Sequence, residues 1–119
     1  MKLGEAIDAV EETYEFMLAY AAQGRRLEDA DTTGGIRASL KRADAALAVI
    51  AQASVPVQDA GDFMDVVRQD AAKSSAAFRL VLAQPSISSQ LIDNLNASIH
   101  VRALLTDLFL LDEALKITA

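Results

Sequence analysis

The residues of this chain whose types are suited to chemistry lie close together in its last third. The single histidine, His100, stands seven residues from both Asp93 and Asp107, and Asn96 precedes it by four residues. On a helix that turns about 100° per residue, these four side chains share one strip. An exposed helical histidine can accept a phosphoryl group, and imidazole beside carboxylates can bind a metal ion. Asp93, Asn96, His100 and Asp107 therefore form a candidate polar site.

Neither chemistry has its usual sequence pattern around this histidine. At helical spacing its neighbours are carboxylates, which repel an incoming phosphoryl group, and Arg102 projects to another side of the helix. A diiron carboxylate bundle needs Glu-x-x-His pairs, but Ala97 stands three residues before His100. We therefore interpret the strip as a solvated polar face, keep phosphotransfer as an alternative function, and predict no catalytic residue, no cofactor and no metal.

Two other polar segments have simpler interpretations. Five carboxylates near the N-terminus fit a solvated helix face near the positive end of a helix dipole; they are Glu5, Asp8, Glu11, Glu12 and Glu15. The tract Thr32-Thr33-Gly34-Gly35 with Arg37 resembles a small anion cradle at a helix N-terminus. It does not match the spacing of a phosphate-binding loop, so capping and turn formation explain the same residues.

The composition indicates one folded domain and narrows the choice of partners. The chain has 119 residues, of which 52% are hydrophobic and 24% charged, a globular balance. Its formal net charge of −6 argues against nucleic-acid binding, and the lack of cysteine excludes thiol chemistry and disulfides. The N-terminal residues do not resemble a signal peptide, and the run of large apolar residues at 108–111 is too short to span a membrane. We expect a cytoplasmic protein without membrane contact.

Hydrophobic spacing predicts four helices, at about 3–23, 33–53, 59–83 and 86–117. Gly24, Pro56 and Pro85 separate them, because glycine favours a helix end and proline breaks the hydrogen-bond pattern. Thr32 or Thr33 is expected to cap the second helix and Asp59 the third. Modest connections between long helices favour an all-α, antiparallel up-down four-helix bundle, with residues 1–119 as a single domain.

The last predicted helix carries more apolar side chains than one face can use, so part of it should be covered by another surface. Phe16 and Tyr20, one turn apart in the first helix, point away from the predicted core stripe. The predicted contact residues are Phe16, Tyr20, Leu104, Leu108, Phe109, Leu111 and Leu115. They favour a non-catalytic protein that forms a homo-oligomer, most simply a dimer, or docks onto a protein partner. A small apolar ligand between the helices is a further alternative.

Overall fold

The computed structural model describes residues 1–28 and 35–118, and these form helices without strands, as predicted. The helices are α1 (Leu3–Ala21), α2 (Ile36–Ala51), α3 (Ala60–Leu82), α4 (Ser89–Asn96) and α5 (Ile99–Thr118). The all-α prediction is confirmed. The predicted count of four helices is wrong for the described ranges, because the last predicted helix is divided into α4 and α5. Within these ranges, no helix combines the length and apolar character that a membrane span requires.

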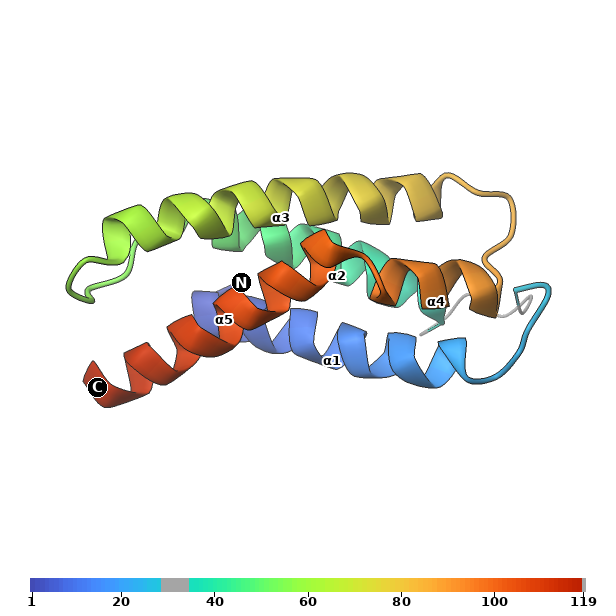
Figure 1. Ribbon diagram of the computed structural model, residues 1–119, viewed down its shortest axis with the longest axis horizontal. Helices are drawn as coiled ribbons and strands as arrows, with labels where there is room; N and C mark the ends of the chain where they lie inside the picture. The colour runs from blue at the N-terminus through green and yellow to red at the C-terminus, as the bar shows by residue number, and fades with distance from the viewer. Residues whose placement is uncertain (29–34, 119) are drawn as a thin grey trace.

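The helices form an elongated body of 46 × 23 × 21 Å. Successive long helices run in opposite directions, and α4 and α5 together return along the molecule (Figure 1). α2 packs against both α1 and α3, whereas α4 lies mainly on α1 and α5 mainly on α3. The last third of the chain therefore changes its packing partner halfway along the molecule.

Several helices begin or end at residues whose types favour a helix end. Gly24 follows α1 in the left-handed conformation, with φ of 65°, which costs little without a Cβ atom. Ser88 is the N-cap of α4, and its Oγ accepts a hydrogen bond from the Leu91 amide at 3.1 Å. Asp59 holds the N-cap position of α3 but has φ of 61° and makes no side-chain cap bond. Gly35 caps α2, so the threonine caps were wrongly predicted.

The break between α4 and α5 is the main departure from the predicted fold. Asn96 ends α4, Ser98 donates its amide to the Leu95 carbonyl, and the Ser98 carbonyl accepts the amide of Arg102. In one straight helix, the apolar residues before the break, such as Ile92 and Leu95, and those after it, such as Leu104 and Leu108, would lie on different sides. A straight helix therefore could not turn both groups toward the interior. The break lets α4 bury Ile92 and Leu95 while α5 buries leucines of its own.

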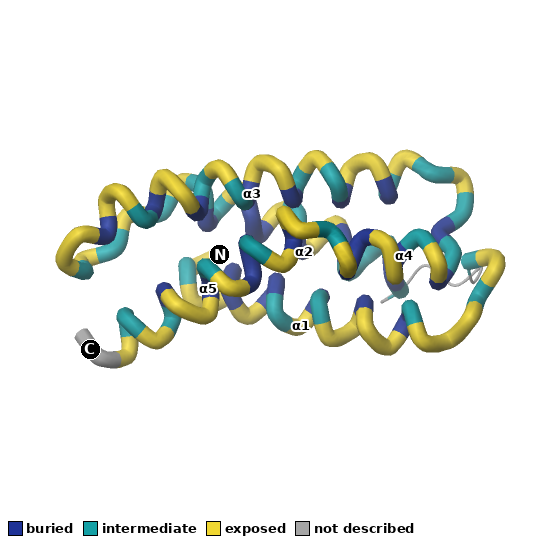
Figure 2. Tube along the Cα trace, in the orientation of Figure 1, coloured by how far each residue is buried: buried dark blue, intermediate teal, exposed yellow. Residues whose placement is uncertain are grey.

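The core is aliphatic, and the buried positions of each helix face the interior (Figure 2). The stripe that apolar spacing predicts for α2 is fully buried; it consists of Ile36, Leu40, Ala43, Leu47 and Ile50. The predicted stripe of α3 is buried except for Phe63, which is half-buried; its other members are Val67, Ala71, Ser74, Phe78 and Val81. The predicted stripe of α1 is Leu3, Ile7, Val10, Tyr14, Met17, Leu18 and Ala21. The buried side of α1 is shifted from this stripe, because Leu18 of the stripe is exposed, whereas Ala9, Thr13 and Tyr20 outside it are buried. This shift arises because α1 packs against α2 on one side and α4 on the other.

Candidate functional site

The four residues of the candidate polar site do not form one surface. Asp93 is exposed on α4 and His100 is exposed on α5, but Asn96 is 8% exposed and Asp107 is half-buried. The break between the helices separates them, so the prediction of a continuous solvated strip is wrong. In the ranges that the structure describes, no three His, Asp or Glu side chains are grouped so that they could hold a metal ion.

Two polar groups at the break, the Asn96 side chain and the His100 backbone carbonyl, face the interior of the protein. Ser74 of α3 donates its hydroxyl to the His100 backbone carbonyl at 3.1 Å, which ties the start of α5 to α3. The Asn96 side-chain amide is buried, and neither its nitrogen nor its oxygen has a hydrogen-bond partner. His100 thus contributes a backbone acceptor to the packing while its imidazole stays at the surface.

Asp107 faces a second carboxyl group, Asp70 of α3. Burial is the largest cause that raises the pKa of Asp107 to about 7, followed by a hydrogen bond to Asp70 and the charge of that group. A hydrogen bond between two carboxyl groups requires one of them to be protonated. Asp107 Oδ2 is buried and has no hydrogen-bond partner. The α3–α5 contact therefore holds a proton at pH values where an ordinary aspartate has lost it.

This pair makes the stability of the protein depend on pH. Because the pKa of Asp107 is raised in the folded state, the folded chain binds more protons than the unfolded chain between about pH 4 and 7. The contribution of Asp107 is therefore greatest at acidic pH and is lost as the pH rises toward 7. We expect Asp107→Asn to remove this loss and to raise the free energy of unfolding at pH 8 by about 1 kcal/mol.

Urea unfolding of both proteins at pH 5 and pH 8 tests this prediction. Asp93→Asn is the matched control, since Asp93 is an exposed carboxylate on α4 and should leave the pH dependence unchanged. The change in unfolding free energy from pH 5 to pH 8 is compared between wild type and Asp107→Asn. If this change is the same in both proteins, the carboxyl pair does not hold the proton.

Arg37 links three segments at the end of the molecule where α3 stops. Its Nε donates to Glu28 at 2.8 Å, and its terminal nitrogens donate to the carbonyls of Leu82 at 2.8 Å and Gln84 at 2.6 Å. The carboxylate of Glu28 also accepts the amide of Ile87 at 3.0 Å. Arg37 thus satisfies carbonyls at the end of α3 that the helix itself cannot pair.

This arrangement corrects the suggestion of an anion cradle around Arg37. The guanidinium is already paired with a carboxylate of its own chain, which occupies the position that a bound anion would take. Thr32, Thr33 and Gly34 lie outside the described residues. The role supported for Arg37 is to hold the end of the molecule together.

Tyr20 also helps to hold this end of the molecule together. Its hydroxyl donates to the Ile87 carbonyl, and its own carbonyl accepts the hydroxyl of Ser89 at 2.7 Å. Ser89 and Arg25 also exchange hydrogen bonds, with the Arg25 amide donating to Ser89 Oγ at 2.8 Å. Tyr20 was predicted to be an exposed contact residue. The structure instead buries it in the packing of the chain itself, because the segment before α4 covers the end of α1.

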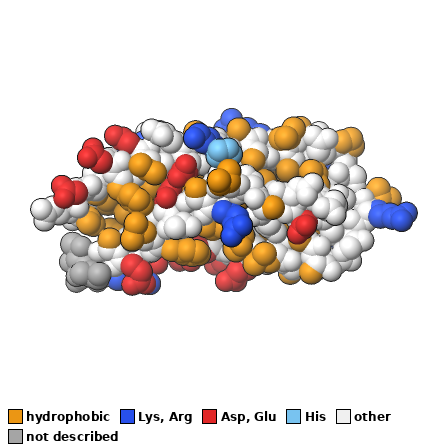
Figure 3. Space-filling model, viewed as in Figure 1, with side chains coloured by type: hydrophobic (Ala, Val, Ile, Leu, Met, Phe, Trp, Pro, Cys, Tyr) orange, Lys and Arg blue, Asp and Glu red, His pale blue; other side chains and the backbone are white. Residues whose placement is uncertain are grey.

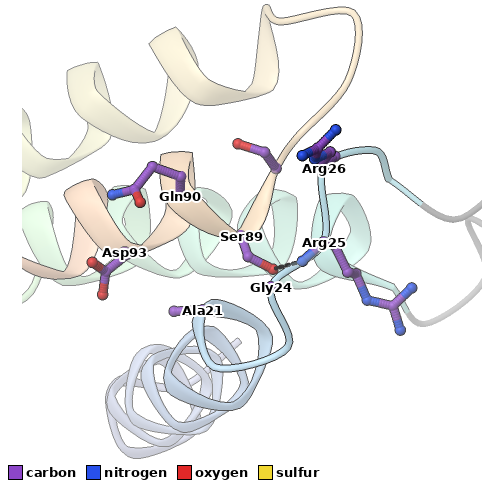
Figure 4. A pocket seen from close by; sticks show the side chains of 8 residues that line it. Ala21, Gly24, Arg25, Arg26, Ser89, Gln90 and Asp93 are labelled. Atoms are coloured by element: carbon purple, nitrogen blue, oxygen red, sulfur yellow. Dashed lines mark hydrogen bonds between the residues drawn. The ribbon is translucent and has the colours of Figure 1, made fainter.

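A pocket of about 520 Å³ lies beside these contacts, between the end of α1 and the start of α4. Its lining combines Arg25 and Arg26 with Ser89, Gln90 and Asp93. The two arginine side chains extend away from Gln90 and Asp93 (Figure 4). The charged groups of this pocket therefore do not converge on a common point where a ligand could be bound.

The structure divides the predicted contact residues between the core and the surface. Leu104, Leu108 and Leu111 are buried within the chain, and Leu115 is half-buried against the same core. These leucines are therefore not free to contact a partner, because the break turns this side of α5 toward α3. Phe16 and Phe109 are exposed, at 38% and 50%.

The two exposed phenylalanines do not belong to one surface. Phe16 lies on the edge of α1 that faces α2, since Glu12, one turn earlier, pairs with Arg42 and Thr13 bonds to the Ser39 carbonyl. Phe109 lies on α5, which packs mainly on α3. The structure therefore leaves Phe109 without the predicted second anchor from α1.

Sequence reasoning missed two residues that accompany Phe109. Ile99 is 74% exposed and Leu110 is 60% exposed, and both lie on α5 opposite the buried leucines. We call this side the outer face of α5; it consists of Ile99, Arg102, Thr106, Phe109, Leu110 and Glu113, all exposed. The apolar character of these residues is visible in the sequence. In a single helix over 86–117, however, Ile99 would lie on the same side as the apolar residues of α4, so it was not grouped with Phe109.

The C-terminal part of the outer face lies where α5 leaves the rest of the molecule. Figure 1 shows α5 diverging from α3 toward the C-terminus. In the view of Figure 3, hydrophobic side chains gather at this end of the molecule, between α5 and the beginning of α3, with acidic groups around them. Clustered exposed apolar side chains of this kind are typical of interaction sites. Comparisons with protein-family models, with curated proteins and with solved structures found no match to this chain.

Proposed function

We propose that this protein is a non-catalytic interaction protein that self-associates through the outer face of α5. The observation that carries the proposal is the exposure of Ile99, Phe109 and Leu110 on one helix whose opposite side packs against the core. Burying a large apolar side chain contributes about 1.5–3 kcal/mol, so covering three of them in each of two chains supplies a substantial driving force.

The charge distribution supports this surface over the others. The outer face carries one cation, Arg102, and one anion, Glu113, among its exposed residues. Most of the chain's surplus of acidic groups lies elsewhere, including the exposed carboxylates of α1. A nearly neutral apolar face can approach a second protein without the repulsion that an acidic face would meet.

The double substitution Phe109→Ser with Leu110→Ser tests the proposal. Removing two large apolar side chains from each chain is expected to raise the Kd of self-association roughly a hundredfold or more. Helicity and the urea midpoint should change little, since both side chains are exposed. Sedimentation velocity over a range of protein concentrations measures the effect.

Leu80→Ser is the matched control, because Leu80 is 65% exposed on α3, away from the outer face of α5. It should leave the Kd unchanged. If the two substitutions in α5 leave self-association as it is in the wild type, the outer face is not the interface. If the wild-type protein is monomeric at high concentration, self-association itself is wrong.

A further inference from the structure

The order of charged, small and large side chains along the outer face of α5 indicates how a second helix would pack on it. At about 100° per residue, its six residues span an arc of about 100°. Ile99 and Arg102 lie at one end of the helix, Thr106 and Phe109 near its middle, and Glu113 toward the other end. A face of this width along a helix of 20 residues is the size of the seam that a single packed helix covers.

The ends of this face carry opposite charges, because Arg102 lies near the start of α5, whereas Asp112 and Glu113 near its end share one cation, Lys116, which leaves a net negative charge there. Arg102 and Glu113 are eleven positions apart, which corresponds to about 16 Å along the helix. A second copy placed parallel would set arginine beside arginine and glutamate beside glutamate. A second copy placed antiparallel would set each arginine beside the glutamate of the other chain. Charge complementarity therefore selects a copy of the same face, in the antiparallel orientation.

The size of the side chains agrees with the charges. The midpoint between Arg102 and Glu113 falls between Asp107 and Leu108. With the axis at this midpoint, Thr106 of one chain lies opposite position 109 of the other. A small residue would thus face a phenylalanine, which allows the two helices to approach closely. The alignment that the charges select therefore also places a small side chain against a large one.

We propose that the outer face of α5 pairs antiparallel with the outer face of a second copy of this chain. A two-fold axis passes between Thr106 and Phe109, and Arg102 of each chain lies beside Glu113 of the partner subunit. The pairing rests on the proposed function, since it requires the protein to self-associate. It adds the orientation, the alignment and the charged residues that fix them.

Charge reversal tests the alignment. Arg102→Glu places two glutamates beside each other twice in the dimer, and Glu113→Arg does the same with arginines. Each single substitution is expected to raise the Kd about tenfold at low salt. The double substitution Arg102→Glu with Glu113→Arg restores both attractions and should return the Kd to within about threefold of wild type.

The effects of the single substitutions should shrink in about 1 M salt, where charges are screened beyond about 3 Å. Far-UV circular dichroism and urea midpoints of all variants check that the monomers stay folded. If the wild type dimerises but the double variant is no better than the single ones, the alignment is overturned while self-association stands. A monomeric wild type overturns both proposals.

Introduced cysteines provide an independent readout, since the chain has none of its own. In the proposed pairing the two copies of residue 106 are displaced by about 4.5 Å along the helix, and the two copies of residue 99 by about 25 Å. Thr106→Cys should form a covalent dimer under mild oxidation, and Ile99→Cys should not. Efficient cross-linking of both variants would indicate a parallel arrangement and overturn the proposal.

Discussion

Replacing Arg37 with alanine is expected to lower the free energy of unfolding by about 3 kcal/mol. The substitution leaves the Glu28 carboxylate, whose side chain is 13% exposed, without its cation. It also removes donors from the carbonyls of Leu82 and Gln84. Buried groups that lose a charged partner bear most of this cost, because water cannot fully replace it. Urea unfolding followed by circular dichroism at pH 7 measures the change.

Arg42→Ala provides the comparison for this experiment. Arg42 also forms an ion pair, with Glu12, but the two side chains are 53% and 61% exposed. Surface pairs of this kind contribute less than about 1 kcal/mol. Arg37→Lys should fall between wild type and Arg37→Ala, because one ammonium cannot reproduce the fork of donors. Equal effects of Arg37→Ala and Arg42→Ala would show that the Arg37 contacts do not stabilise the end of the molecule.

Leu108→Ala should lower the free energy of unfolding, whereas Leu110→Ala should weaken self-association. Leu108 is fully buried, so its truncation leaves a cavity and is expected to cost about 3 kcal/mol of unfolding free energy. Leu110, two positions later, is 60% exposed, and its truncation should change monomer stability by less than about 0.5 kcal/mol. Leu110→Ala should instead weaken self-association, since Leu110 lies on the outer face of α5.

Measuring stability and Kd for both variants separates the inner side of α5 from its outer side. Unfolding at a protein concentration below the Kd keeps the two quantities apart, because association otherwise stabilises the folded state. A large loss of stability in Leu110→Ala would mean that this residue is covered within the monomer. A small loss in Leu108→Ala would contradict the packing of α5 on α3.

Much of the fold was predictable from local patterns. The stripes of α2 and α3, the helix stop at Gly24 and the serine cap of α4 each depend on residues close in sequence. The break after Asn96 was not predictable in the same way. No glycine or proline marks it, and its cause is tertiary, since α4 and α5 bury different faces against different helices. Helical periodicity alone cannot report such a change of partner.

The candidate sites were harder to predict for the same reason. The pairing of Asp107 with Asp70 and of Arg37 with Glu28 depends on helix contacts that the sequence does not encode locally. Tyr20 illustrates this limit, because its exposure was inferred from the wheel of α1 but the segment around Ile87 covers it. Phe109, one of the predicted contact residues, is exposed, whereas Leu104, Leu108 and Leu111, which were predicted with it, are buried.

The mass of the wild-type protein in solution tests self-association most directly. One chain has a mass of 12.7 kDa. Sedimentation equilibrium over micromolar to millimolar concentrations should show the mass rise from this value to twice this value, and the Phe109→Ser, Leu110→Ser protein should stay at the single-chain mass. A wild-type mass of 12.7 kDa throughout this range would contradict the proposed interface on α5.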